Sequence, residues 1–379
     1  KPIANDLISQ LKEHKEELIE FIEKHQTKAS VTLLPDITNL SESFSGKIPL
    51  SFSQERLWFL DQLNGSLEYH VPFMLNLKGN LNSSAIEQSI RTIISRHEIL
   101  RTVIIAEDGV PFQKVTDYHG WSMLQKETSI INSKKDVEEF TKVPFDLSKD
   151  SMLKACLFRV NKNHHILVCL FHHIVSDAWS SGIFMNELSE LYHSFSNNKP
   201  TTLSPLDIQY SDYAIWLRNH VEETLLDQQI NYWKNKLENV NNLSLPTDFP
   251  RPAIQSKNGA STTLEPDKAL SKDVLQLCQK EDVTLFILML SAFKILMSRY
   301  SNQKDICIGS PIANRTQIEL EGLIGFFTNT LAFRSNLEGN PRFNDFLQTV
   351  KQTTLEGYDH QLVPFEKIVD SVSNQRDLS

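Results

Sequence analysis

Residues 164–180 read HHILVCLFHHIVSDAWS, and this stretch decides how the surrounding chain can fold. Its first part is a short apolar run rich in branched and aromatic side chains, which is typical of a buried β-strand. The polar residues that follow indicate a turn and then the start of a helix. Because side chains at strand ends in α/β folds reach into clefts, His172, His173 and Asp177 are predicted to border a functional cleft.

The segments on either side of this strand alternate between helical and strand patterns. Helices are predicted for residues 84–100 and 282–300, and a strand is predicted for residues 305–312. The second helix is apolar nearly all round, which predicts that it is buried in the centre of a lobe. Strands and helices thus alternate on both sides of the chain midpoint, which predicts an α/β fold.

Length and composition limit the possible function classes. At 379 residues the chain exceeds the size at which one hydrophobic core usually keeps growing, so two lobes or domains are expected. A hydrophobic content of 40% with 22% charged residues is ordinary for a globular protein. The formal net charge of -9 argues against nucleic acid as a partner, because nucleic-acid binders concentrate Lys and Arg.

The four cysteines show no C-x-x-C spacing, which favours free thiols in a reducing cytosol. They are Cys156, Cys169, Cys278 and Cys307. The first residues lack the pattern of a secretion signal, and the longest apolar stretch, residues 285–297, is interrupted by Ser291 and Lys294. These features predict a cytoplasmic protein without a membrane partner.

The histidine pair could supply acid–base chemistry, because imidazole accepts a proton near neutral pH and can activate an amine or an alcohol. Adjacent strand residues point to opposite faces, so at most one of His172 and His173 faces a given cleft. The carboxylate of Asp177 could orient an imidazole or pair with an arginine, and its spacing leaves both roles open. The sequence lacks the motifs of zinc proteases, serine hydrolases and nucleotide-binding loops, so no metal site is predicted.

FHHIVSDAWS resembles the HHxxxDG signature of the condensation domains of nonribosomal peptide synthetases. Six further segments resemble core motifs of that family and occur in the family's order. They are SFSQERLWFLDQL (51–63), RHEILRT (96–102), YSDYAIWL (210–217), IGFFTNTLAFR (324–334), HQLVPFE (360–366) and RDLS (376–379). The resemblance extends from Ile48 to Ser379, and so many ordered motifs make a coincidental match implausible.

The resemblance implies an α/β fold of two chloramphenicol-acetyltransferase-like lobes, arranged as a V-shaped pseudo-dimer with a central tunnel. It divides the chain into residues 1–26 as the C-terminal helix of a docking domain, 27–47 as a linker, 48–220 as the N-lobe and 221–379 as the C-lobe. The C-lobe would be incomplete at its C-terminus, because the family has further strands after RDLS.

The implied reaction is peptide (amide) bond formation between a donor acyl or peptidyl thioester and the α-amine of an acceptor aminoacyl thioester. Phosphopantetheine arms of an upstream donor and a downstream acceptor carrier protein would hold both substrates, and the domain itself would bind no cofactor. Further implied partners are an adjacent adenylation domain and the C-terminal docking tail of an upstream synthetase subunit. The motifs look most like the subtype that joins an L-configured donor to an L-amino acid, although starter-type domains share them.

By the same resemblance His173 is the catalytic residue, which takes the amine proton or positions the amine. His172 and Asp177 would be structural, and Asp177 would pair with Arg96 or Arg101. The residues implied to lie at the substrate tunnel are Ala178, Trp179, Ser180 and Asn329, with a packing role for Asn329 equally consistent.

Two other functions fit this sequence. A noncatalytic platform of the same fold would recruit tailoring enzymes, and an ester-forming acyltransferase of the wider superfamily would use an alcohol acceptor. Ala178 stands where the signature has glycine, which adds a methyl group and restricts any positive φ angle. The intact His172, His173 and Asp177 favour the condensation reaction.

Overall fold

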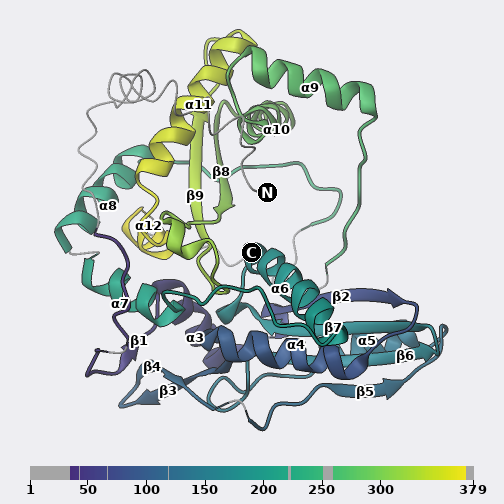
Figure 1. Ribbon diagram of the computed structural model, residues 1–379. Coiled ribbons are helices and arrows are strands. Elements are labelled where there is room, and N and C mark those ends of the chain that lie inside the picture. The colour runs from purple at the N-terminus through teal and green to yellow at the C-terminus, as the bar shows by residue number, and fades with distance from the viewer. Residues whose placement is uncertain are drawn as a thin grey trace, which may run out of the picture. The chain divides into compact units, whose positions relative to one another are not determined.

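The computed structural model describes residues 35–41, 43–65, 67–117, 119–220, 223–250 and 259–372 (Figure 1). The chain divides into two units, Lys1–Pro35 and Asp36–Ser379. The predicted docking helix at residues 1–26 and the RDLS motif at residues 376–379 lie outside the described residues. The domain boundaries therefore stay predictions.

A four-stranded sheet contains the strand predicted from residues 164–180. Its order is β2 (His70–Lys78), β7 (His164–His172), β6 (Leu153–Asn161) and β5 (Leu124–Glu127). β5 runs parallel to β6, and the other neighbours are antiparallel. The predicted strand is confirmed as β7, which pairs with a neighbour along both of its edges. Its continuous apolar composition fits this central position.

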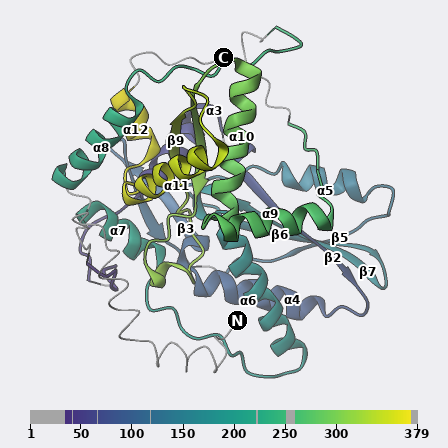
Figure 2. The ribbon, with the colours of Figure 1, turned by 90° about the horizontal axis from the view of Figure 1, so that it is seen from above.

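Helices cover both faces of this sheet. They are α4 (Ser83–Arg96) and α6 (Ala178–Ser196), which lie side by side on one face, and α5 (Ser133–Thr141) on the other (Figures 1 and 2). Phe184 of α6 contacts Phe171 of β7, with ring centroids 5.0 Å apart. On the opposite face Phe140 of α5 contacts Phe158 of β6 at 6.2 Å. The predicted helix at residues 84–100 is confirmed as α4, which ends at Arg96.

The remaining elements before residue 240 surround this sheet. They are β1 (Ile48–Pro49), α3 (Phe52–Asn64), η1 (Leu67–Tyr69), η2 (Glu98–Arg101), β3 (Thr102–Glu107), β4 (Val110–Val115), η3 (His173–Val175), α7 (Tyr210–His220) and α8 (Glu223–Leu237). Strands β1, β4 and β3 form an antiparallel sheet in that order. Helix α3 begins with a capping box, in which Ser51 and Gln54 bond each other's backbone N–H.

The described residues after position 267 form a second group of elements. They are α9 (Lys268–Lys280), α10 (Leu285–Ser301), β8 (Asp305–Ile312), η4 (Ile318–Leu320), β9 (Asn329–Asn336), α11 (Phe343–Asp359) and α12 (Phe365–Val372). Strands β8 and β9 pair antiparallel, with α10 and α11 packed against them. The predicted strand at residues 305–312 is confirmed as β8, and the predicted α/β class is confirmed.

Helix α10 corrects one prediction. Its central burial was expected from an almost uniformly apolar sequence, but Met289, Phe293 and Leu296 are 46–56% exposed within the described unit. The reason is that α10 packs through one side only, against β8, α9 and α11. Among the described residues no single helix meets the length and apolarity needed to cross a membrane, whereas α9 and α10, bent by 104°, meet them as a pair. All four cysteines are free.

Candidate active site

The turn between β7 and α6 carries the residues that the sequence singled out. Strand β7 ends at His172, and His173 begins the short helix η3. Asp177 then caps α6, because its Oδ1 accepts a hydrogen bond from the Ser180 backbone N–H at 2.9 Å. Strand β7 before the histidine pair, and the 3-10 turn and the N-cap after it, fix the backbone around the two histidines.

His172 is part of the core. Its side chain is fully buried, and its Nδ1 accepts a hydrogen bond from the Ile174 N–H at 3.1 Å. Burial, together with the neighbouring His70 and His173, lowers the pKa of His172 to about 3. His172 is therefore a neutral, structural histidine at physiological pH.

His173 has a different environment from its neighbour. It is half-buried, and its ring makes no hydrogen bond to the described residues. Its Nδ1 is buried without a partner there, while the ring packs against Phe326 with centroids 4.6 Å apart. Of the two adjacent histidines, His173 is thus the one with both partial exposure and unused hydrogen-bonding capacity.

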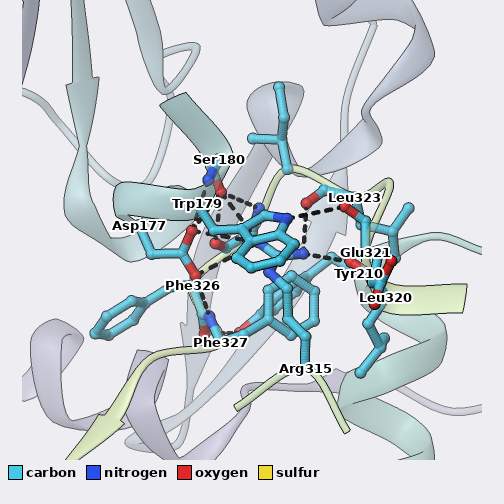
Figure 3. Close-up of polar contacts among 12 residues, drawn as sticks. Asp177, Trp179, Ser180, Tyr210, Arg315, Leu320, Glu321, Leu323, Phe326 and Phe327 are labelled. Atoms are coloured by element: carbon cyan, nitrogen blue, oxygen red, sulfur yellow. Dashed lines mark hydrogen bonds and ion pairs between the residues drawn. The ribbon is translucent and has the colours of Figure 1, made fainter. Parts of the chain in front are cut away.

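Asp177 holds a buried ion pair with Arg315, a residue that follows β8 (Figure 3). Arg315 Nη2 lies 3.2 Å from Asp177 Oδ1, and the two side chains are 2% and 1% exposed. The carboxylate also accepts hydrogen bonds from Ser180 Oγ at 2.7 Å and from the Phe327 N–H at 3.2 Å. These partners occupy both oxygens of the carboxylate and hold it in the loop, while the structural role predicted for Asp177 stays a prediction.

The predicted pairing of Asp177 with Arg96 or Arg101 is wrong. Arg96 Nε donates to Glu187 Oε1 at 2.9 Å, and Arg101 Nη2 lies 3.1 Å from Glu98 Oε1. The true partner is 138 residues away in sequence, so motif proximity could not identify it. A usable signal was present, because Arg315 follows a predicted strand just as Asp177 does.

Arg315 joins the two groups of elements. Its Nη1 donates to the carbonyl oxygens of Leu320 and Leu323, the latter at 2.7 Å, and its guanidinium lies 4.1 Å from the centre of the Phe327 ring. Burial lowers the pKa of Arg315, and the charge of Asp177 opposes that shift. An arginine keeps its charge even so, and it fixes residues 320–327 against the start of α6.

Close contacts of the backbone at residues 325 and 326 also hold this segment against Ser180 and Tyr210. Ser180 Oγ accepts a hydrogen bond from the Gly325 N–H at 3.1 Å, and the Tyr210 hydroxyl donates to the Phe326 carbonyl at 2.7 Å. A Cβ added to Gly325 would lie 2.3 Å from Tyr210 Cδ2, so a glycine is needed here. These contacts hold the residues on both sides of Phe326, whose ring lies on His173.

His97 is a positioning residue that sequence reasoning missed. Its Nε2 donates to Glu187 Oε2 at 3.0 Å, and its Nδ1 accepts the Ile324 N–H at 3.3 Å. Burial raises the pKa of Glu187, but hydrogen bonds from His97 and Arg96 hold it below the ordinary value. The motif RHEILRT contains His97, but the prediction from this motif used its two arginines only.

Three of the four residues predicted to lie at a tunnel begin helix α6, and they differ in exposure. Ala178 is the exposed first residue of α6 and has no positive φ, so the methyl group imposes no backbone strain. Trp179 is 46% exposed and donates its indole N–H to the Glu321 carbonyl at 3.0 Å. Ser180 is buried between the start of α6 and Gly325.

Asn329 is buried, and hydrogen bonds occupy both ends of its amide. Its Nδ2 donates to the carbonyl oxygens of Gln361 and Val363 at 2.9 and 2.8 Å, and its Oδ1 accepts from the N–H groups of Thr330 and Phe365. These contacts support the packing role. Its place at a tunnel stays a prediction.

The lowered pKa of His172 makes a prediction about acid stability. Between about pH 6.5 and pH 3 the unfolded chain binds a proton at this position that the folded chain does not, so the free energy of unfolding falls with falling pH. From pH 7 to pH 4 this amounts to roughly 3 kcal/mol. In His172→Asn, whose Oδ1 takes the place of Nδ1 and can still accept from the Ile174 N–H, urea unfolding at the two pH values should show a smaller loss of unfolding free energy, by that amount. Equal losses in both proteins would contradict the assigned burial effect.

Comparison with known proteins places this site in a family context. Residues 44–379 match the family model of the condensation domain. The chain is 41% identical to one subunit of the linear gramicidin synthase of Brevibacillus parabrevis over 344 residues, which is 88% of this chain and 4% of that protein. It is 35% identical to bacitracin synthase 2 of Bacillus licheniformis over 379 residues, which is 100% of this chain and 14% of that protein. The chain thus spans a small part of these relatives.

Solved structures agree with the sequence comparison. The X-domain from teicoplanin biosynthesis superposes with a TM-score of 0.80 at 26% identity, over 91% of this chain and 77% of that one. The first condensation domain of the CDA synthetase superposes with a TM-score of 0.70 at 15% identity, over 85% of this chain and 78% of that one. The chloramphenicol-acetyltransferase-like α/β fold predicted from the motifs is confirmed by these neighbours. The chain belongs to the condensation-domain family.

Proposed function

We propose that the chain catalyses amide-bond formation between a donor acyl or peptidyl thioester and the α-amine of an acceptor aminoacyl thioester, during nonribosomal peptide synthesis. Membership of the condensation-domain family and the similarity to peptide synthases support this reaction. The observation that carries the proposal is the contrast between the paired histidines. His172 is buried and bonded, whereas His173 is partly exposed and its ring has no hydrogen bond to the described residues.

His173 acts on the attacking amine in this proposal. Its Nδ1 is buried, so Nε2 is the nitrogen assigned to accept the amine proton or to hold the amine by a hydrogen bond. The amine nitrogen attacks the thioester carbonyl, the new C–N bond forms and the C–S bond breaks. The departing thiolate takes up the proton that the amine has lost. Since a thioester is already reactive, alignment of amine and carbonyl supplies a large part of the acceleration.

Asp177 and Arg315 have a positioning role. The Asp177 carboxylate accepts from Ser180, Arg315 and Phe327, and these bonds leave it no part in proton transfer. Arg315 keeps the 320–327 segment in place and thereby keeps Phe326 on the His173 ring. Their charge pair sets the orientation of the catalytic residue without touching the substrates.

The reaction requires partners that this chain does not supply. We assign the two substrates to phosphopantetheine arms of an upstream donor and a downstream acceptor carrier protein, with an adenylation domain adjacent. Residues 1–26 are proposed to receive the C-terminal tail of an upstream subunit. We assign the chain to the cytoplasm and to the subtype that joins L-configured residues, on the motifs quoted from the sequence.

Transfer between carrier proteins tests this function. Donor and acceptor carriers are loaded with defined peptidyl and aminoacyl groups, the purified chain is added, and the acceptor is followed by intact mass spectrometry. We expect the acceptor to gain the donor acyl mass. An acceptor loaded with a hydroxy acid in place of the amino acid distinguishes the ester-forming alternative. Binding of carriers without product over a broad donor panel would reject the proposal.

A recruitment platform is the second candidate function. A specific observation favours it, because a structure with a TM-score of 0.81 and 26% identity is described as the complex of the X-domain and OxyB from teicoplanin biosynthesis. For this chain the corresponding function would be to bind a tailoring enzyme without forming a bond. Failure of transfer with retained carrier binding is the result that this candidate expects.

A further inference from the structure

A cavity lies at the end of β7 opposite to the catalytic histidine. It has a volume of about 360 Å³ and is lined by residues of β5, β6, β7 and the segment that leads into α4. His165 lies in its wall, eight residues before His173 on the same strand and its continuation. At ~3.3 Å per residue the two histidines are roughly 25 Å apart, so the cavity is separate from the site described above.

Strand register brings ionisable side chains together on one face of the sheet. Arg159 of β6 lies opposite His165 of β7, and Glu127 of β5 lies opposite Arg159. Side chains directly opposite each other share a face, and this is the face that α4 and α6 cover. The three strands therefore present Glu127, Arg159 and His165 in one row beneath the start of α4.

The N-terminus of α4 forms another part of the wall. Asn80, Leu81 and Ser83 line the cavity, and the helix that begins at Ser83 has 14 residues. Backbone N–H groups in the first turn of a helix and the aligned peptide dipoles favour a negative charge nearby. A helix start alone does not make a site, but here it meets cationic side chains.

His165 supplies the second, independent indication of a ligand. Its side chain is 9% exposed, and its Nδ1 is buried without a hydrogen-bond partner among the described residues. Burial lowers its pKa, with Arg159 and His164 adding to the effect and Glu127 opposing it. Because Nδ1 is closed to solvent and so to the cavity, Nε2 is the ring nitrogen that can reach a ligand there, and it also has no hydrogen-bond partner among the described residues.

The charges around this cavity favour an anion. Two cationic side chains on this face border it, Arg159 and Lys162, against the single carboxylate of Glu127, while Lys126 is opposite Phe158 and belongs to the other face. Arg159 Nη1 lies 3.3 Å from Glu127 Oε1, but both side chains are more than half exposed, so this pair is weak. A cationic cluster in a chain of net charge -9 is a local departure from its overall charge.

We propose that this cavity binds a phosphate-type oxyanion, either inorganic phosphate or the phosphoryl group of a phosphomonoester. Donors approach it from the helix start, from Arg159 and Lys162, and from the imidazole of His165. Converging donors from several directions suit a tetrahedral oxyanion carrying two charges. This inference is independent of the transfer reaction, because it involves no residue of the β7–α6 turn.

Isothermal titration calorimetry with inorganic phosphate, and separately with glycerol 3-phosphate, tests the proposal at constant ionic strength with chloride as the reference anion. We expect saturable one-to-one binding of at least one of these ligands, weakened about tenfold or more in Arg159→Gln and in Lys162→Gln. Binding of both ligands indicates a site for the phosphoryl group itself. Binding of only one identifies free phosphate or a phosphomonoester as the source.

Lys114→Gln is the matched control, since Lys114 is exposed on β4 in the other sheet. Its affinity for phosphate should equal that of the unaltered chain. As a second readout, the imidazole NMR signals of His165 should report a rise of its pKa when the ligand is bound. Absence of saturable binding, or equal weakening in Lys114→Gln and Arg159→Gln, overturns the proposal. Circular dichroism and the unfolding temperature confirm that each variant is folded.

Discussion

His173→Ala is expected to slow transfer from donor to acceptor carrier by about 100-fold or more, while the protein stays folded. The side chain is only half-buried and makes no hydrogen bond to the described residues, so its removal breaks no bonded contact of the fold. The rate falls because the variant lacks the imidazole that takes up the amine proton in the proposed reaction. Some activity should remain, because bound thioester and amine are still aligned.

His193→Ala is the matched control, because His193 is an exposed histidine on the neighbouring helix α6. Single-turnover rates for both variants, measured by mass spectrometry with the same loaded carriers, compare the two positions directly. A His173→Ala rate within about threefold of the unaltered chain would exclude a role for this imidazole in the rate-limiting step. Unchanged unfolding temperatures would show that the loss is chemical and not structural.

Asp177→Ala is expected to lower the free energy of unfolding by about 3–5 kcal/mol. The substitution leaves the guanidinium of Arg315 buried without its counter-charge, since the two side chains are 2% and 1% exposed. It also removes the N-cap of α6 and the acceptor for the Phe327 N–H. Urea unfolding followed by tryptophan fluorescence measures the change.

Two further variants separate the charge effect from other losses. In Asp177→Asn/Arg315→Met both charges are absent, and we expect a smaller loss than in Asp177→Ala because no buried charge is left unpaired. Glu107→Ala breaks the exposed ion pair between Lys47 and Glu107 and should cost less than about 1 kcal/mol. A cost of Asp177→Ala as small as that of Glu107→Ala would contradict the assigned role of the buried pair.

The site was partly predictable because its first half is continuous in sequence. The apolar run at residues 164–171 predicts strand β7, and a strand end followed by a helix start predicts the turn at His172, His173 and Asp177. The opposite facing of adjacent strand residues predicts different environments for the two histidines. The structure has one of them buried and bonded and the other half-buried without a hydrogen bond to the described residues.

The partners of these residues could not be predicted in the same way. Asp177 pairs with Arg315 and not with Arg96 or Arg101, and His97 bonds Ile324, because β8 and its following loop return to the start of α6. Local patterns carry no information on which distant segments meet. From the sequence alone, Arg96, Arg101 and Arg315 are equally suitable partners for a carboxylate. The glycine at position 325 likewise acquires its reason only from the nearby Tyr210 ring.

By itself, then, the sequence determined the α/β class, strand β7, helix α4 and the turn that carries His172, His173 and Asp177, because periodicity and capping act over a few residues. Tertiary structure decided the ion-pair partner of Asp177, the link from His97 to residue 324 and the exposed side of α10. It also decided that Arg159, Lys162 and His165 share a cavity with the start of α4. These features depend on strand register and on contacts between segments far apart in the chain, and only the folded chain brings such segments together.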